Sequence, residues 1–109
     1  MNLRTRLWLR CGGYCEKCGL PLEPSWAMHH RKLKSRGGKD EITNVLALHH
    51  HCHNLGTHSV HLAPTLATVQ GYLVASWDDP SKIAVTLGDG QEALLTEDGQ
   101  YEFLDKEGK

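Results

Sequence analysis

Residues 44–61 read NVLALHHHCHNLGTHSVH and contain six of the eight histidines in this 109-residue chain. The two others, His29 and His30, are adjacent to each other a short distance upstream. Imidazole is the commonest metal ligand and also a general base near neutral pH. A chain of this length builds only a modest core and profits from a bound metal. The histidine-rich stretch therefore indicates where the chemistry of this protein is located.

Short strands and helices are predicted around this stretch. The histidine-rich residues themselves predict the beginning of a helix, because ligands several residues apart must converge on one side. Gly12 and Gly71 are expected to end helices, and Pro64 to open one. The apolar patterns predict helices over residues 2–10 and 64–70 and strands over residues 26–31 and 45–48.

The character of the sequence changes after Gly71, where β-like segments alternate with turns. The turns Asp89-Gly90 and Asp98-Gly99 help to separate four such segments, over residues 72–75, 83–87, 93–96 and 101–104. The whole pattern predicts an α+β fold in a single domain. We expect residues 1–71 to form its core and residues 72–109 a β-hairpin appendage packed on that core.

Charge is divided unevenly along the chain, although the net charge is only −1. Residues 1–39 hold nine Lys or Arg and two acids, whereas residues 40–109 hold three lysines and eleven acids. A focused basic region is typical of phosphate binding, so we expect DNA or RNA to bind the first part; a solvated basic face is the alternative. Neither a signal peptide nor a membrane-length apolar run is found, which predicts a cytoplasmic protein without membrane contact.

Two ligand pairs predict a structural zinc site. A Cys-x-x-Cys pair and a His-x-x-Cys pair each form a tight knuckle, which brings two ligands to one tetrahedral ion. A redox-active thiol pair and a disulfide are less favoured, because of the second pair and the lack of a signal sequence. Cys11 is expected to be a small buried apolar residue. The expected ligands are Cys15, Cys18, His49 and Cys52, with His50 or His51 as substitutes for His49.

His29 and His30 suit a division of labour between a metal ligand and a base. Adjacent residues on a strand point to opposite faces, so the two rings cannot easily bind one ion together. One ring can hold a metal while the other activates a water molecule.

These residues together resemble the HNH endonuclease family. The resemblance covers about residues 10–61 and rests on Cys15-x-x-Cys18-Gly19, His29-His30-Arg31, Asn44 and Leu48-His49-x-x-Cys52-His53. The stretch from His49 onward, with Pro64, Ala67 and Gly71 behind it, looks most like small phage-type HNH proteins. The family implies a ββα-metal (His-Me finger) core with a zinc-knuckle pair, between the N-terminal helix and the C-terminal β-rich appendage. It also implies a metal-dependent DNA endonuclease that nicks or cuts DNA, with phage DNA processing or packaging as its setting.

The resemblance assigns the chemistry to three residues. His29 takes the position of the first metal ligand and His30 that of the general base. Asn44 takes the position of the residue that orients the base by hydrogen-bonding across the loop. The implied reaction is attack of a His30-activated water on phosphorus, which leaves a 5′-phosphate and a 3′-hydroxyl.

The same resemblance makes His53 a ligand of the catalytic ion. The family often has its third ligand four residues later, where this chain has Thr57. We therefore expect His61 to be the third ligand, with His58 as the alternative. Zn²⁺ is the expected structural ion, and Mg²⁺, Mn²⁺, Ni²⁺ or Zn²⁺ the catalytic one.

Basic residues beside the two adjacent histidines are candidates for holding the DNA backbone. They are Arg31, Lys32, Lys34 and Arg36. The acidic C-terminal part is a candidate surface for a protein partner, such as the packaging terminase beside which phage-type HNH proteins can work. The alternative function is a non-catalytic zinc-binding module that binds DNA or a protein.

Overall fold

The strand β2 (Val45–Leu48) lies at the centre of the computed structural model, which describes residues 1–104, and all four of its residues are buried. Val45 and Ala47 belong to a hydrophobic cluster with the N-terminal helix. Leu46 and Leu48 belong to a second cluster, which they share with the C-terminal part of the chain. Burial on both faces explains why this strand is a continuous apolar run rather than an alternating one.

The predicted α+β class is confirmed. The helical elements are α1 (Leu3–Cys11), η1 (Lys34–Arg36), η2 (His51–Leu55), α2 (Pro64–Val69) and η3 (Pro80–Lys82). The strands are β1 (Ala27–His30), β2, β3 (Val85–Thr86), β4 (Glu92–Leu95) and β5 (Tyr101–Phe103). Within residues 1–104, no helix combines the length and the apolar character needed to cross a membrane. Residues 105–109 of the expected C-terminal appendage lie outside the described part of the chain.

The ends of α1 follow from its capping residues. The side chain of Asn2 accepts a hydrogen bond from the Thr5 N–H at 2.8 Å and begins the helix. Gly12 ends it in the left-handed conformation, with φ at 67°, which a glycine adopts at little cost. The predicted N-terminal helix is therefore confirmed, shifted by one residue.

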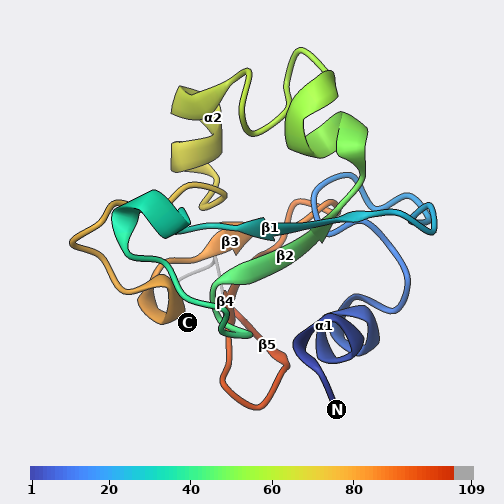
Figure 1. Ribbon diagram of the computed structural model, residues 1–109, viewed down its shortest axis with the longest axis horizontal. Helices are drawn as coiled ribbons and strands as arrows, with labels where there is room; N and C mark the ends of the chain where they lie inside the picture. The colour runs from blue at the N-terminus through green and yellow to red at the C-terminus, as the bar shows by residue number, and fades with distance from the viewer. Residues whose placement is uncertain (105–109) are drawn as a thin grey trace.

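The strands β1 and β2 form an antiparallel pair in which His29 lies opposite Leu46 and His30 opposite Val45. After β2, His49 and His50 lead into η2, a single turn of π-helix that carries part of the histidine-rich stretch. In Figure 1, η2 and α2 lie above this strand pair and α1 lies below it. The strands β1 and β2 and the helical turn η2, which follow one another in the sequence, therefore also lie next to one another in space.

The C-terminal strands form a separate antiparallel sheet in the order β3-β4-β5. Val85 and Leu95 are buried in the same hydrophobic cluster as Leu46 of β2, so this sheet and the strand pair share a core. The prediction of a strand over residues 72–75 is wrong. The Tyr72 N–H bonds to the end of α2 and the Val74 N–H to the carbonyl of Arg31, so this backbone pairs with no neighbouring strand in the described chain.

A buried ion pair ties α1 to the strands and to the Cys-x-x-Cys turn. Arg10 and Glu16 form two hydrogen bonds, at 2.9 and 3.0 Å, and both side chains are about 1% exposed. Glu16 also accepts hydrogen bonds from the Ala47 N–H at 2.8 Å and from the Tyr101 hydroxyl at 2.5 Å. Because Glu16 lies between two predicted zinc ligands, this network holds their turn against β2 and β5.

Candidate metal centres and active site

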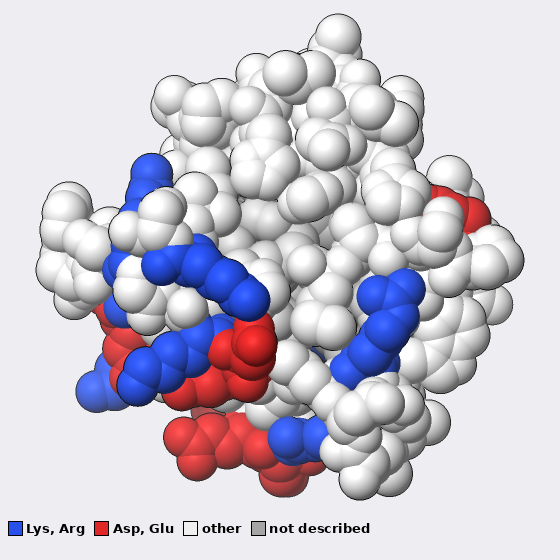
Figure 2. Space-filling model, viewed as in Figure 1, with Lys and Arg blue, Asp and Glu red and all other residues white. Residues whose placement is uncertain are grey.

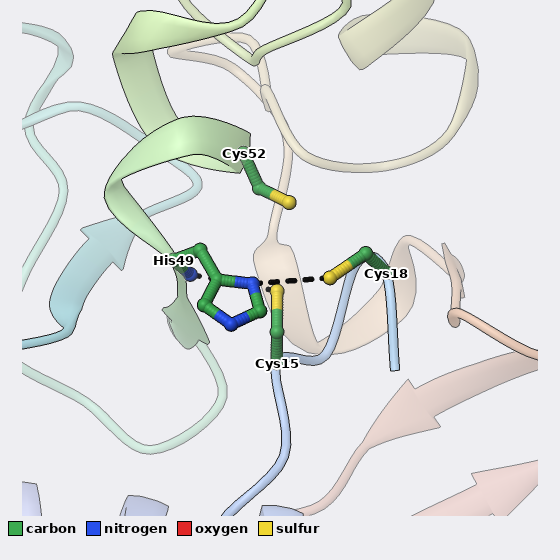
Figure 3. Close-up of side chains that lie close together, drawn as sticks. All are labelled: Cys15, Cys18, His49 and Cys52. Carbon is green, nitrogen blue, oxygen red and sulfur yellow. Dashed lines mark hydrogen bonds between the residues drawn. The ribbon is translucent and has the colours of Figure 1, made fainter. Parts of the chain in front are cut away.

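Four side chains from three segments form the first cluster, in which each ligand atom lies within 4.8 Å of the others. Two come from the turn after α1, one directly follows β2, and one comes from η2. Figure 3 shows the three sulfur atoms and one imidazole nitrogen turned toward a common centre. A set of three thiols and one imidazole at this spacing fits a tetrahedral zinc ion. The members are Cys15, Cys18, His49 and Cys52.

His49 presents one defined nitrogen to this cluster. Its Nδ1 lies 3.1 Å from the Cys18 sulfur, and its Nε2 donates a hydrogen bond to the Pro21 carbonyl at 2.6 Å. A second hydrogen bond of this kind orients a metal-binding imidazole and leaves the other nitrogen free for the ion. The ring of His50 instead donates to the Ser25 carbonyl, and His51 is exposed. Of the alternatives for the fourth position, the structure brings His49 to the sulfur atoms.

The thiols of this cluster are held apart from solvent to different degrees. Burial raises the pKa of Cys15 and of Cys52. Both thiols must lose a proton when an ion binds, so metal binding is coupled to proton release.

Cys11 lies outside the cluster and packs, half-buried, against the hydrophobic cluster of α1. It is thus less buried than the sequence predicted.

Three histidines form a second cluster, again with ligand atoms within 4.8 Å of one another. His29 comes from β1, His53 from η2, and His61 from the segment before α2. The Nε2 atoms of His53 and His61 lie 3.1 Å apart. His58 is exposed and its Nδ1 contacts the adjacent Thr57 hydroxyl instead, so the structure brings His61 and not His58 to the cluster.

The buried ring of His29 is neutral and has one nitrogen lone pair available, as a metal ligand requires. Its Nε2 donates to the Tyr72 carbonyl at 2.6 Å, which leaves the lone pair on Nδ1. Nδ1 is also buried, and it has no hydrogen-bond partner within residues 1–104. Burial lowers the pKa of His29 to about 3, and burial followed by the nearby His61 lowers the pKa of His53. A neutral imidazole with an unpartnered buried nitrogen fits an ion bound there.

His30 lies outside this cluster of three. Its Nε2 lies 2.6 Å from the Asp40 Oδ1, and the Lys34 ammonium lies 3.5 Å from the same oxygen. The sequence analysis missed Asp40, although it is the first acid after a run of basic residues. The contact places an acidic side chain directly on the ring that was expected to act as base.

Asn44 hydrogen-bonds across the loop, as expected, but not to the ring of His30. Its Oδ1 accepts from the Lys32 N–H at 2.8 Å, and its Nδ2 donates to the carbonyls of Lys32 and Lys39. Within residues 1–104, no hydrogen bond joins Asn44 to the His30 ring. The expected direct orientation of the base by Asn44 is therefore corrected: Asn44 holds the backbone of the loop between β1 and β2.

The prediction that Arg31 contacts DNA is wrong, because its side chain is fully buried. The guanidinium donates to four backbone carbonyls, at 2.5 to 3.1 Å. Burial lowers the pKa of Arg31 to about 10, so it keeps its charge at neutral pH. The carbonyls belong to Thr43, Gly71, Pro80 and Ile83.

The other basic candidates remain accessible around η1. The side chain of Lys34 is 67% exposed, Arg36 is exposed, and Lys32 is half-buried. Figure 2 shows Lys and Arg side chains beside η1, whereas the surface over η2 and α2 is uncharged. The sequence explains this contrast, since residues 42–77 contain no Lys, Arg, Asp or Glu.

The family model described as HNH endonuclease matches residues 15–59. The match includes the four residues of the first cluster, both adjacent histidines, Asn44 and His53, whereas His61 lies just beyond it. No curated protein and no solved structure matches the chain.

Proposed function

We propose that this chain, whose residues 15–59 match the HNH endonuclease family model, is a member of that family and a metal-dependent endonuclease that hydrolyses DNA phosphodiester bonds. The observation that carries the proposal is the convergence of His29, His53 and His61 beside a further histidine, His30. The unpartnered buried Nδ1 of His29 is hard to explain without a ligand, because buried polar atoms are normally paired. Zinc held by the three-cysteine, one-histidine cluster would have a structural role.

Each histidine has a separate task in this proposal. His29, His53 and His61 would hold a divalent ion, which supplies charge stabilisation at the scissile phosphate when bound. The Tyr72 carbonyl keeps the His29 ring in one tautomer. A ring nitrogen of His30 would accept the proton of the attacking water. The assignment of His30 as the base uses its position next to His29 on β1. This position keeps His30 close in the chain to the metal ligand His29 but outside the cluster of three histidines.

The accessible basic residues support DNA as the substrate. Lys34 and Arg36 belong to η1, and Lys32 lies between His30 and this helix, so all three could contact phosphates on either side of the scissile bond. Such contacts carry no sequence information, so we expect cleavage of many sequences and an affinity that falls steeply with salt.

A plasmid-cleavage assay with matched variants tests this proposal. Wild type, His30→Ala, His61→Ala and His58→Ala would be incubated with EDTA, Mg²⁺, Mn²⁺, Ni²⁺ or Zn²⁺, and the zinc bound to each protein measured. We expect metal-dependent nicking or linearisation by wild type and by His58→Ala, and loss of about 10²–10⁴-fold in rate for His30→Ala. His58 is a matched control because it lies near the cluster in sequence but outside it in space.

Two results would contradict the proposal. Intact plasmid with every ion, from a folded protein that contains zinc, would favour the non-catalytic zinc-binding module. Equal activity of wild type and His30→Ala would contradict the assignment of the base while leaving the nuclease in place.

A further inference from the structure

The ring of His30 is held by an acid that belongs to neither ligand cluster. The Asp40 Oδ1 lies 2.6 Å from the His30 Nε2, and Lys34 contacts the same oxygen at 3.5 Å. The His30 side chain is 19% exposed and the Asp40 side chain 63% exposed. A short charge-assisted contact therefore connects the proposed base to the loop between β1 and β2.

The loop is built in a way that brings Asp40 to this position. Asn44 donates to the carbonyl of Lys39, the residue before Asp40, at 3.1 Å. Gly38 passes so close to Lys32 that a Cβ at this position would lie 1.7 Å from the Lys32 carbonyl oxygen. Only a glycine allows this approach of two backbone segments. Asn44 thus holds the backbone of Lys39, the residue that precedes Asp40.

We propose that Asp40 is a positioning residue that fixes the tautomer of His30 and thereby assigns the base function to the His30 Nδ1. The inference deepens the proposed function and rests on it. A carboxylate only accepts hydrogen bonds, so the hydrogen of a neutral His30 lies on Nε2 and the lone pair on Nδ1. The hydrogen bond from His30, followed by the charge of Lys34, lowers the pKa of Asp40, which keeps this carboxylate ionised at neutral pH.

The proton transfer follows from this tautomer. One O–H bond of the attacking water breaks and its proton forms the N–H bond at the His30 Nδ1. The electron pair of that O–H bond stays on the oxygen, which forms the bond to phosphorus. The electron pair of the P–O3′ bond leaves with the 3′ oxygen, which takes a proton from solvent water to give the 3′-hydroxyl. His30 is then an imidazolium that faces the Asp40 carboxylate, which stabilises the new charge without taking a proton itself.

The tautomer can be measured directly and without any cleavage assay. Two-bond ¹H–¹⁵N spectra of the zinc-loaded, ¹⁵N-labelled protein distinguish Nε2–H from Nδ1–H imidazoles, and the His30→Gln spectrum identifies the His30 signals. We expect the Nε2–H form in wild type and a mixed population in Asp40→Ala. An Nδ1–H form in wild type, or the same tautomer in Asp40→Ala, would overturn the inference.

Cleavage kinetics provide the second test, with Glu41→Ala as a matched control. Glu41 is the exposed acid next to Asp40, so both variants remove one negative charge from the same loop. For Asp40→Ala we expect kcat to fall roughly tenfold to a hundredfold with KM changed by no more than about twofold. Asp40→Asn should also be impaired, since an amide can donate to Nε2 as well as accept from it. Bound zinc and thermal stability should match wild type in all three variants.

The possible failures are distinguishable. Faster cleavage by Asp40→Ala would mean that Asp40 blocks the basic nitrogen, and equal losses in Asp40→Ala and Glu41→Ala would mean a general effect of charge; either result overturns the positioning role. If wild type itself cleaves no DNA, the proposed function fails, and the tautomer spectra still decide whether Asp40 fixes the His30 ring.

Discussion

Replacing Arg31 by alanine separates a structural role from a DNA-binding role at one position. The wild-type guanidinium is fully buried and donates to carbonyls of the loop after η1, of the end of α2 and of the η3 region. One of these carbonyls belongs to Gly71, which precedes Tyr72, whose own carbonyl orients the ring of His29. The substitution should therefore destabilise the fold first and disturb the histidine cluster as a consequence.

The expected loss follows from the four hydrogen bonds. A hydrogen bond to a charged group contributes about 1.5–3 kcal/mol net, and each carbonyl left unpaired in the interior costs about 1–3 kcal/mol. Burying the cation costs several kcal/mol, which alanine recovers, so the terms partly cancel. We expect the free energy of unfolding to fall by about 3–5 kcal/mol, a large fraction of the ~5–15 kcal/mol typical of a domain. Arg31→Lys keeps the charge but loses the planar guanidinium with its several N–H donors. Its free energy of unfolding should therefore lie between those of wild type and Arg31→Ala.

Urea unfolding of the zinc-loaded proteins measures this loss, and DNA affinity is measured on the same samples. Arg36→Ala is the matched control, because Arg36 is exposed and, within residues 1–104, its side chain makes a single long hydrogen bond, at 3.4 Å, to the Val74 carbonyl. The control should change stability by no more than about 0.5 kcal/mol and weaken DNA binding. Unfolding of Arg31→Ala at the wild-type urea concentration, together with weaker DNA binding, would refute the reasoning from burial.

Three further predictions concern the metal centres and the buried ion pair. His61→Ala should lose the catalytic ion, which would be seen as a loss of metal-dependent cleavage and of one bound Ni²⁺ in calorimetry. His58→Ala should retain both the cleavage and the bound Ni²⁺. Equal behaviour of the two variants would exclude His61 as a ligand. Strong chelation should remove the structural zinc and lower the thermal midpoint, because the binding free energy of such an ion is folding free energy; an unchanged melting curve after verified zinc removal would contradict a structural role. Glu16→Gln should destabilise the protein by about 3–5 kcal/mol in urea unfolding, since it leaves Arg10 buried without its charge partner, and wild-type stability in this variant would show that the pair contributes little.

Features that depend on local sequence could be predicted well. The caps at Asn2 and Gly12 set the ends of α1, because capping involves only neighbouring residues. The x-x spacing of the two zinc-type pairs likewise predicts which side chains turn together, and the structure brings those four to one centre. Strand periodicity also predicted that the two histidines of β1 face opposite sides, and the structure has one ring in the cluster of three and the other outside it, whereas the resemblance to the family named His29 as the ligand.

Features that depend on contacts between distant segments were decided only by the tertiary structure. Arg31 and Lys32 are neighbouring cations in the sequence, yet one is buried and one half-exposed, because residues 71–83 fold back over Arg31. The path of the chain after η2 likewise selects His61 over His58, which local spacing leaves open.

The contact of Asp40 with His30 is the clearest example of a contact that the sequence could not predict. It lies ten residues from His30 in sequence, and the Gly38 approach and the Asn44 bonds must both form before its carboxylate reaches the ring. The sequence by itself determined the kinds of ligands, their pairing by spacing and the class of fold. Which charges are buried and which acid holds the base depended on packing, because burial and hydrogen bonding between distant segments have no local signature in the sequence.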